Sequence, residues 1–219
     1  MGRRNVLMVV TSHSHMEDKP TGVWLSEFAE PFDAFQKEDF DITVASIKGG
    51  YAPIDPRSID EDAEERWKSA IHQLSQTTPI NEVSDRGYDA IFLPGGHGTM
   101  FDFPNNQKLQ HLIQQFAETD RIVAAVCHGP AGFVNVKLSN GDYFVMGRQL
   151  TSFTDDEERT AHLDYYVPFL LEQRLRQRGA QFIGKDTFTN NVVTDEKLIT
   201  GQNPQSGESI ALRVINMLQ

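Results

Sequence analysis

Short apolar segments alternate along this chain with segments whose apolar residues recur at helical spacing. Four runs predict buried strands, at residues 6–10, 40–45, 90–93 and 122–126. The stripe Leu25, Phe28, Phe32 and Phe35 predicts a helix over 25–37, and a similar stripe predicts one over 106–119. Strands that are apolar throughout are expected to be covered on both faces. The alternation therefore predicts an α/β fold with a doubly wound, mainly parallel sheet between helices.

The second half of the chain has a less regular pattern. Residues 142–146 and 148–153 predict short, partly antiparallel strands, and 181–184, 192–193 and 198–200 predict the last strands. A helix is expected from near Pro168, a residue suited to a first helical position, to Gly179. Residues 204–218 predict the closing helix. Residues 50–87 are irregular, and we expect an excursion over one sheet edge or a partial lid within a single domain of residues 1–219.

Composition narrows the class of protein. Hydrophobic residues make up 39% of the 219 residues, as in ordinary globular chains. The formal net charge of −11 disfavours nucleic acid and anionic lipid as partners. No apolar run approaches the roughly 20 residues that span a bilayer. A single cysteine excludes an internal disulfide and, without a recognisable secretory signal, predicts a reducing, cytoplasmic setting.

That single cysteine, Cys127, is the strongest candidate for chemistry. It ends the apolar run 122–126 and is followed by His128, Gly129 and Pro130. In α/β sheets, ligands bind at the carboxyl ends of strands, and a nucleophile on a tight strand-to-helix turn is held up at that edge. We expect the N-terminus of a following helix to favour the thiolate. A lone cysteine at a strand end is more often structural, but this setting favours a nucleophile.

Three further groups accompany it. Residues 94–98, Pro-Gly-Gly-His-Gly, end another strand, and their glycines let backbone N–H groups approach a reacting atom, although a plain turn has the same composition. Glu27 lies on the apolar stripe of the first helix, where a buried carboxyl would keep its proton, yet its residue type favours exposure. His13 and His15 lie in the first strand-end loop, where a pair of histidines is more often hydrogen-bonded than metal-binding.

The motifs resemble the ThiJ/PfpI superfamily, whose members share the flavodoxin-like fold of the class I glutamine amidotransferases. Four pieces match in order, at residues 21–27 with 31–32, 46–50 with 53–56, 93–100, and 126–130. The sequence is most similar to the heat-shock chaperone and glyoxalase III branch, in its shorter, metal-free form. The resemblance implies a cofactor-independent enzyme that acts on a small reactive aldehyde, and a homodimer.

The resemblance also implies residue roles. Cys127 would be the nucleophile, Glu27 a protonated acid beside it, and His128 the triad histidine. The triad acid follows a Phe-Thr-Asp motif, which is residues 153–155 here and makes Glu158 the aligned acid, with its acidic neighbours 155–157 as alternatives. The N–H groups of Gly96 and His128 would form the oxyanion site. The wider substrate-binding set would be Gly95, Gly96, His97, Gly129 and Trp24.

Three functions follow as hypotheses. The first is a glutathione-independent glyoxalase (glyoxalase III, of the D-lactate dehydratase type) that converts methylglyoxal to lactate through a Cys127 hemithioacetal. The second is an amidase or peptidase that uses the same thiolate, although bulk near Trp24 and a lid from residues 50–87 would suit a small substrate. The third is a redox-responsive stress protein or holdase chaperone, which would need an accessible cysteine or an exposed apolar patch.

Overall fold

The chain folds around a seven-stranded sheet, and the computed structural model describes residues 3–219. The strand order is β10-β11-β7-β6-β1-β4-β5. The bounds are β1 Asn5–Val10, β4 Asp41–Ser46, β5 Thr78–Pro79, β6 Ala90–Leu93, β7 Ile122–Val126, β10 Val192–Asp195 and β11 Leu198–Gly201. The pair β10 and β11 is antiparallel, and the other neighbours in this sheet are parallel. The predicted flavodoxin-like, mainly parallel α/β fold is confirmed.

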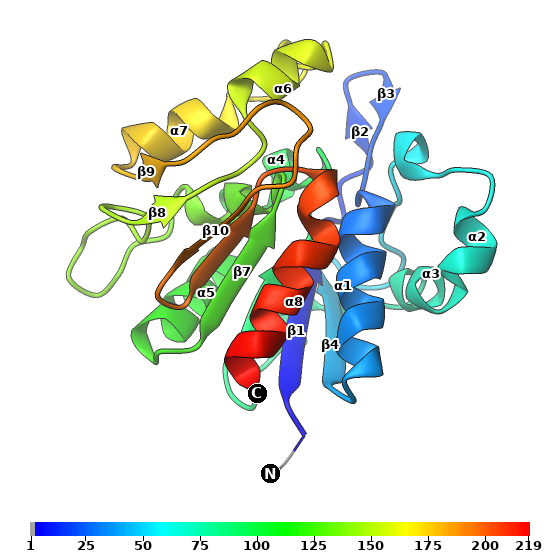
Figure 1. Cartoon of the computed structure of the whole chain (residues 1–219), viewed down its shortest axis with the longest axis horizontal. Helices are drawn as coiled ribbons and strands as arrows, with labels where there is room; N and C mark the ends of the chain where they lie inside the picture. Colours follow the sequence, from blue (N-terminus) through cyan, green and yellow to red (C-terminus); the bar gives the residue numbers. More distant parts are fainter. Residues whose placement is uncertain (1–2) are drawn as a thin grey trace.

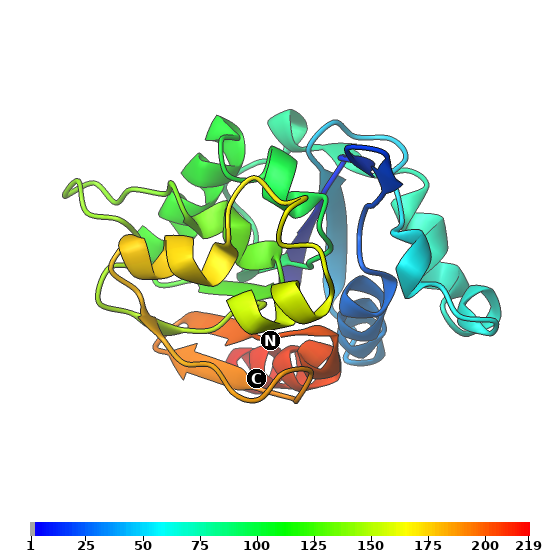
Figure 2. The same ribbon diagram turned by 90° about the horizontal axis from the view of Figure 1, so that it is seen from above.

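Helices cover both faces of the sheet. Helices α1 (Leu25–Lys37) and α8 (Gly207–Leu218) lie side by side on one face, and α5 (Gln107–Glu118) covers the other (Figures 1 and 2). Strand β1 supplies both cores, because Val6 and Met8 pack under α1 and α8 while Leu7 and Val9 pack under α5. All four side chains are fully buried. The uninterrupted apolar run therefore reflects a strand that is covered twice.

The shorter elements lie at the rim of this sandwich. A hairpin joins β2 (His15–Met16) to β3 (Lys19–Pro20), α4 (Thr99–Asp102) follows β6, and the 3₁₀ helix η3 (Gly129–Phe133) follows β7. Helices α6 (Asp155–Thr160) and α7 (Leu171–Gln177) cross above the strand ends (Figure 1). The strands β8 (Gln149–Leu150) and β9 (Gln181–Phe182) form a small separate sheet. Among the described residues, no helix is long and apolar enough to cross a membrane.

Several predictions for the second half were wrong. Residues 142–146 form no strand and contribute one isolated bridge, between Lys137 and Tyr143. Strands β8 and β9 are parallel to each other, not antiparallel. Helix α7 begins at Leu171 instead of near Pro168, since the chain stays extended at Leu170. The closing segment starts as a 3₁₀ turn, η4 (Pro204–Ser206), before α8. A short apolar run does not show which strand it pairs with. Its sequence therefore predicts only weakly whether it forms a strand and in which direction that strand pairs.

Helix α6 was not predicted from its sequence. Thr154 caps it, because the Thr154 hydroxyl accepts a hydrogen bond from Glu157 N–H at 3.1 Å. The Glu157 carboxylate accepts in return from Thr154 N–H at 2.9 Å. This reciprocal capping box fixes where the helix starts. Its first turn holds all four acidic residues, 155–158, and points two of them, Glu157 and Glu158, into the protein.

The segment 50–87 runs along the sheet edge beyond α1 (Figure 2). It contains η1 (Pro56–Ser58), α2 (Ala63–Arg66), α3 (Lys68–Leu74), β5 and η2 (Ile80–Glu82). Its first part is tied to the loop before α1, since Val23 N–H donates to the Pro53 carbonyl at 2.7 Å and Asp55 N–H donates to the Val23 carbonyl at 2.9 Å. Gly22 permits this approach, because a Cβ there would lie 2.2 Å from the Pro53 oxygen. The contact brings η1 to the carboxyl ends of the strands.

Candidate active site

Cys127 occupies a sharp turn at the end of β7. Its φ of 58° is in the left-handed region, which a residue with a Cβ adopts only under constraint. Two hydrogen bonds hold the turn, from Cys127 N–H to the Gly201 carbonyl and from Phe153 N–H to the Cys127 carbonyl, both at 2.9 Å. Position 129 of this turn requires glycine, because a Cβ at Gly129 would lie 2.2 Å from the Leu93 oxygen. This geometry is that of a nucleophile elbow.

A continuous chain of polar contacts starts at the Cys127 sulfur. His128 Nδ1 lies 3.3 Å from Cys127 Sγ, and His128 Nε2 lies 2.6 Å from Glu158 Oε2. All three side chains are buried, with Cys127 only 3% exposed. Among the four acidic residues at the start of α6, Glu158 is the one whose carboxylate contacts His128. The arrangement is that of a cysteine nucleophile, a base and an orienting carboxylate.

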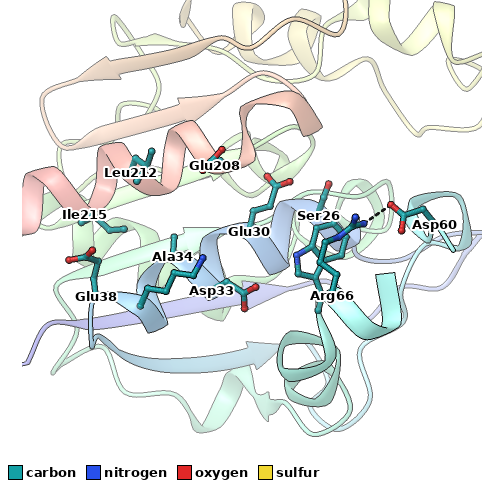
Figure 3. Close-up of a pocket in the computed structure, with 12 residues that line it drawn as sticks. Ser26, Glu30, Asp33, Ala34, Glu38, Asp60, Arg66, Glu208, Leu212 and Ile215 are labelled. Atoms are coloured by element: carbon teal, nitrogen blue, oxygen red, sulfur yellow. Dashed lines mark hydrogen bonds and ion pairs between the residues drawn. The ribbon is translucent and has the colours of Figure 1, made fainter. Parts of the chain in front are cut away.

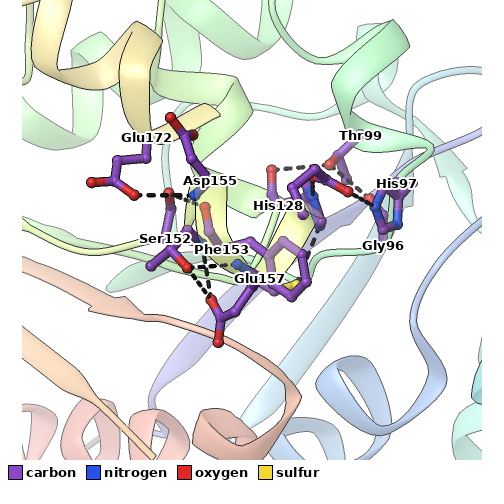
Figure 4. Close-up of polar contacts among 12 residues, drawn as sticks. Gly96, His97, Thr99, His128, Ser152, Phe153, Asp155, Glu157 and Glu172 are labelled. Atoms are coloured by element: carbon purple, nitrogen blue, oxygen red, sulfur yellow. Dashed lines mark hydrogen bonds and ion pairs between the residues drawn. The ribbon is translucent and has the colours of Figure 1, made fainter. Parts of the chain in front are cut away.

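His97 forms a second arm on the same carboxylate. Its Nε2 lies 2.6 Å from Glu158 Oε1, and its ring lies beside the His128 ring at a centroid distance of 4.0 Å (Figure 4). On its other side, His97 Nδ1 lies 3.3 Å from Arg57 Nη2. Burial raises the pKa of Glu158, but the two histidines outweigh it and hold that pKa well below its usual range. Glu158 is therefore a carboxylate.

The donor pattern decides the tautomers of both rings. A guanidinium can only donate, so His97 Nδ1 accepts from Arg57 and the ring proton lies on Nε2, directed at Glu158. His128 Nε2 likewise donates to Glu158, which leaves Nδ1 free to take the Cys127 proton. His97, His128 and Glu158 also form the described cluster with metal-ligand spacing, their ligand atoms lying within 4.8 Å of one another. Protonated nitrogens do not ligate metals, so the set fits a hydrogen-bond network better than a metal site.

Glu27 is a second buried acid next to the Cys127 thiol. The carboxyl is fully buried against Gly95, where a Cβ would lie 2.4 Å from Glu27 Oε2. Neither carboxyl oxygen makes a well-formed hydrogen bond with the described residues. Burial raises the pKa of Glu27 well above its usual value, and the neighbouring Cys127 and Gly95 only partly offset it. Exposure, which residue type alone favoured, was wrong, and burial favours the protonated form of Glu27.

The environment of the thiol differs from the one predicted. The helix after Cys127 is the five-residue 3₁₀ helix η3, not an α-helix, so its dipole is small. Burial raises the pKa of the Cys127 thiol, and proximity to Glu27 adds to the effect. The prediction that the N-terminus of a following helix favours the thiolate was therefore wrong. The group positioned to accept the thiol proton is His128 Nδ1, 3.3 Å away.

Two backbone N–H groups in the turns after β6 and β7 have no backbone acceptor among the described residues. Neither the Gly96 nor the His128 N–H donates a hydrogen bond to the residues that the structure describes. Thr99 ties the two loops together, since its hydroxyl lies 2.8 Å from the Gly96 carbonyl and 2.9 Å from the His128 carbonyl. Gly96 has a φ of 103°, and a Cβ there would meet the Gly22 carbonyl at 2.1 Å. The two N–H groups are thus available to a developing oxyanion.

The remaining predicted binding residues also lie at this edge. Trp24 N–H donates to the Gly95 carbonyl at 3.2 Å, and the Arg57 guanidinium lies over the Trp24 ring at 5.8 Å. His13 and His15 are elsewhere in their loop: His13 stacks on Phe101 at 4.5 Å, and His15 Nδ1 lies 2.7 Å from the Ser14 hydroxyl. The two histidines thus have the ordinary polar and stacking contacts expected of them.

A separate groove of about 840 Å³ lies between α1, α8 and the start of α2 (Figure 3). Its lining is acidic, with Glu30, Asp33 and Glu208 facing few cations. Burial raises the pKa of Glu30, and the nearby Glu208 adds to the rise. The residues that line the groove include no cysteine or histidine, so it lacks the residue types gathered around Cys127.

Comparison with known proteins places this site in a family. The model of the DJ-1/PfpI family matches residues 20–217. The chain belongs to the DJ-1/PfpI family. The resemblance inferred from four short motifs is therefore confirmed over nearly the whole chain.

Relatives within the DJ-1/PfpI family carry informative names. Glyoxalase 3 of Candida albicans is 30% identical, with 96% of each chain covered. The glutathione-independent glyoxalase HSP31 of Saccharomyces cerevisiae is also 30% identical, over 100% of each chain. Among solved structures, glyoxalase III of C. albicans superposes with a TM-score of 0.85 at 30% identity, covering 97% of this chain and 96% of that one. The Rapid Encystment Protein of Francisella tularensis gives a TM-score of 0.93 at 35% identity over 99% of each chain.

Sequence reasoning missed three parts of this DJ-1/PfpI site. It did not find Arg57, which reaches His97 from the segment 50–87, nor the Thr99 hydroxyl that links the two loops. It also missed Glu157, whose buried carboxylate accepts hydrogen bonds from Phe188 N–H and the Asn203 amide, both at 2.8 Å. Arg57 had a signal, because it follows the motif at residues 53–56. Glu157 had only its capping-box spacing from Thr154, and the contact of Thr99 with the His128 carbonyl had no signal, because that partner is distant in sequence.

Proposed function

We propose that this protein is a glutathione-independent glyoxalase of the glyoxalase III type that converts methylglyoxal to lactate. One observation carries the proposal. A buried thiol lies between a base whose Nδ1 is free, 3.3 Å away, and a carboxyl that burial keeps protonated. An isomerisation that moves a proton between adjacent carbons needs a nucleophile, a base and an acid in one dry site. The names of the full-length relatives support the same reaction.

The reaction begins with thiolate formation and addition. His128 Nδ1 takes the Cys127 proton, and Glu158 stabilises the resulting imidazolium through its 2.6 Å contact with Nε2. The thiolate adds to the aldehyde carbon of methylglyoxal, and the C=O electron pair moves onto oxygen. The N–H groups of Gly96 and His128 stabilise that oxyanion until it takes the proton from His128. The product of this step is a hemithioacetal on Cys127.

The next step moves hydrogen between carbons. A base, His128 in our assignment, removes the proton from C1 while Glu27 donates its proton to the C2 oxygen, which gives an enediol. The imidazolium of His128 then donates its proton to C2, and the C1 hydroxyl proton returns to the Glu27 carboxylate, which gives a lactoyl thioester. Water, deprotonated by His128, cleaves the thioester and restores the thiol. The sum is methylglyoxal plus water giving lactic acid, so no external oxidant, reductant or cofactor is consumed.

The test is lactate production from methylglyoxal by the purified protein without glutathione. We expect Cys127→Ala to lower lactate formation by at least ~10⁴-fold, because the covalent route is lost. The same protein should unfold at nearly the native temperature, since the thiol makes no structural hydrogen bond beyond its own site. Equal lactate from both proteins would exclude Cys127 as the nucleophile, and no lactate from the native protein would exclude the substrate.

The alternatives are separated by other measurements. A peptidase needs an open cleft, whereas Cys127 is 3% exposed, so the geometry favours a small substrate. An acyl-enzyme formed from an amide and seen by mass spectrometry would favour hydrolysis. Suppression of client aggregation that survives Cys127→Ala would favour a holdase. A homodimer and a cytoplasmic location belong to the same proposal, and sedimentation of the purified protein tests the first.

A further inference from the structure

Arg57 connects the segment 50–87 to the catalytic carboxylate. Its guanidinium forms a two-pronged pair with the buried Asp55, with Nε–Oδ1 at 2.9 Å and Nη2–Oδ2 at 2.5 Å. Asp55 is itself fixed, because it also accepts from Arg57 N–H at 3.0 Å and from the Thr21 hydroxyl at 2.9 Å. Burial raises the pKa of Asp55, but Arg57 and Thr21 outweigh it and keep the carboxyl charged. The guanidinium is therefore held in one orientation.

The held guanidinium determines what His97 does. Arg57 Nη2 lies 3.3 Å from His97 Nδ1, and His97 Nε2 lies 2.6 Å from Glu158 Oε1. Because guanidinium nitrogens have no lone pair to offer, Nδ1 must accept and the ring proton must be on Nε2. In that tautomer His97 donates to Glu158, whose other oxygen faces His128 at 2.6 Å. Each carboxylate oxygen then has one imidazole donor.

We propose that Arg57 is a positioning residue that fixes His97 as the neutral Nε2–H tautomer, so that His97 holds Glu158 in place and His128 is the one histidine of the pair that takes the Cys127 proton. Arg57 acts through His97 and Glu158 and does not touch the reacting atoms. The role rests on the proposed glyoxalase reaction for its effect on rate, but the tautomer itself does not.

The charges around His97 explain why its proton state matters. Burial lowers the pKa of His97 to about 4, together with the neighbouring His128 and Arg57, while Glu158 opposes the shift. These are the titratable and charged groups that face the ring; Phe153 packs on it as an uncharged neighbour. Without Arg57, Nδ1 would be free to accept a proton. A His97 cation would share Glu158 with His128 and disfavour the imidazolium that His128 must become.

The direct test is ¹⁵N NMR of the ring nitrogens of His97 in the full-length protein near neutral pH. The proposal predicts an unprotonated Nδ1 and a protonated Nε2. In Arg57→Met, which keeps the length of the side chain but removes its donors, Nδ1 is free to take a second proton, so His97 should titrate at higher pH while Nε2 stays protonated against Glu158. A protonated Nδ1 in the native protein would overturn the proposal without any variant, so poor folding of Arg57→Met does not leave it untested.

A matched control lies in the same segment. Arg66 forms an ion pair with Asp60 at 2.5 Å and stacks on Trp67, at the edge of the acidic groove and away from Cys127 (Figure 3). Arg66→Met removes an exposed Arg–Asp pair from the same segment, so its His97 spectrum and pH profile should match those of the native protein. A change as large as that of Arg57→Met would mean that the effect comes from loosening the segment, and would overturn the positioning role.

The pH profile of kcat/KM supplies the second readout. We expect Arg57→Met to lose roughly tenfold near neutral pH, less than the ~10²–10⁴-fold of an acid–base group itself. Its acidic limb should move toward neutrality, because His97 gains a proton at higher pH. Arg57→Lys, which keeps a donor cation, should restore part of the limb. An unshifted limb in Arg57→Met would reject the role. If the native protein makes no lactate but shows the predicted tautomer, the proposed function fails and the tautomer assignment stands.

Discussion

Two glutamates, Glu27 and Glu158, are buried within the same site but have opposite properties. Glu158 has an imidazole donor on each oxygen, both at 2.6 Å, and these contacts hold its pKa well below the usual range. Glu27 has no well-formed hydrogen bond among the described residues, and burial raises its pKa. The difference comes from partners and not from depth, since Glu27 is fully buried and Glu158 is 3% exposed.

The contrast assigns the chemistry of the site. A carboxyl that keeps its proton can donate it to a substrate oxygen, whereas a carboxylate that is fully hydrogen-bonded can only orient and stabilise a base. Under the proposed function, the same residue type thus supplies both an acid and an orienting anion within one site. Partners that lie far away in the chain, in the turns after β6 and β7 and on η1, create the difference.

Among variants of the two glutamates, the largest effect is expected from Glu158→Gln. Two imidazole N–H groups need acceptors at this position, but the amide offers only one acceptor oxygen. One imidazole N–H therefore faces the amide N–H₂, which is itself a donor. We expect kcat/KM for methylglyoxal to fall by roughly 10³-fold, because His128 loses its orientation and its counter-charge. The free energy of unfolding should fall by about 3 kcal/mol, since a partner of a buried network is removed. Steady-state kinetics and chemical denaturation measure the two effects.

Asp156→Asn is the control for that variant. It changes an exposed carboxylate on the same short helix, whose contact is a surface pair with Arg159 at 3.1 Å. Both activity and stability should stay near native values. If Glu158→Gln behaves like this control, the carboxylate does not orient the base and the contrast with Glu27 has no catalytic meaning.

Glu27→Gln should have a smaller effect on activity and the opposite effect on stability. A neutral amide has nearly the shape of the protonated carboxyl and cannot ionise. Because no charge can form in the buried site, the protein should be at least as stable as the native one near neutral pH. The amide is not an acid, so kcat should fall by roughly 10²-fold. Kinetics and thermal unfolding on the same samples separate the two effects.

Glu30→Gln provides the matched comparison on α1. Glu30 lies one turn further along the helix, faces the groove and is half-buried. Its replacement should leave kcat unchanged. A Glu27→Gln protein that is strongly destabilised near neutral pH would show that Glu27 is charged in the native state, and would remove the basis of the proton-donor role.

Much of this fold was predictable, because apolar runs such as residues 6–10 and 122–126 must be covered on both faces whatever follows them. Cys127 was predictable for a related reason, since strand ends meet at one edge of a parallel sheet and small residues follow it there. The short segments at residues 142–153 were not, because a two-residue strand is defined by its partner and not by its own pattern.

The partners within the site were harder to predict than its nucleophile. Glu27 has the same local pattern whether it is buried or exposed, and only the packing of Gly95 against it decides. The position of Glu158 depends on the capping box of Thr154 and Glu157, a motif present in the sequence but separate from any long apolar stripe. The position of Arg57 depends on a contact between the loop before α1 and η1, and no pattern of apolar residues predicts that contact.

The smallest predicted effect, and the most direct measure of the contrast, is the pH dependence of stability. Glu27 has a folded-state pKa above the 4.5 of the free side chain, so its stabilising contribution is complete below about pH 4.5 and is lost as pH rises toward the folded pKa. Glu158 has a folded-state pKa below 4.5, so its contribution is complete above about pH 4.5 and is lost as pH falls. Relative to the native protein, Glu27→Gln should therefore gain stability as pH rises, by up to roughly 1.4 kcal/mol per pH unit, whereas the deficit of Glu158→Gln should shrink as pH falls. Titration of His97 contributes equally to the stability of the native protein and of Glu27→Gln, because this substitution leaves the His97 contacts with Glu158 and Arg57 in place. It therefore cancels when these two proteins are compared. Denaturation of the three proteins across the pH range gives both slopes, and two slopes of the same sign would mean that the two carboxyls do not differ in charge.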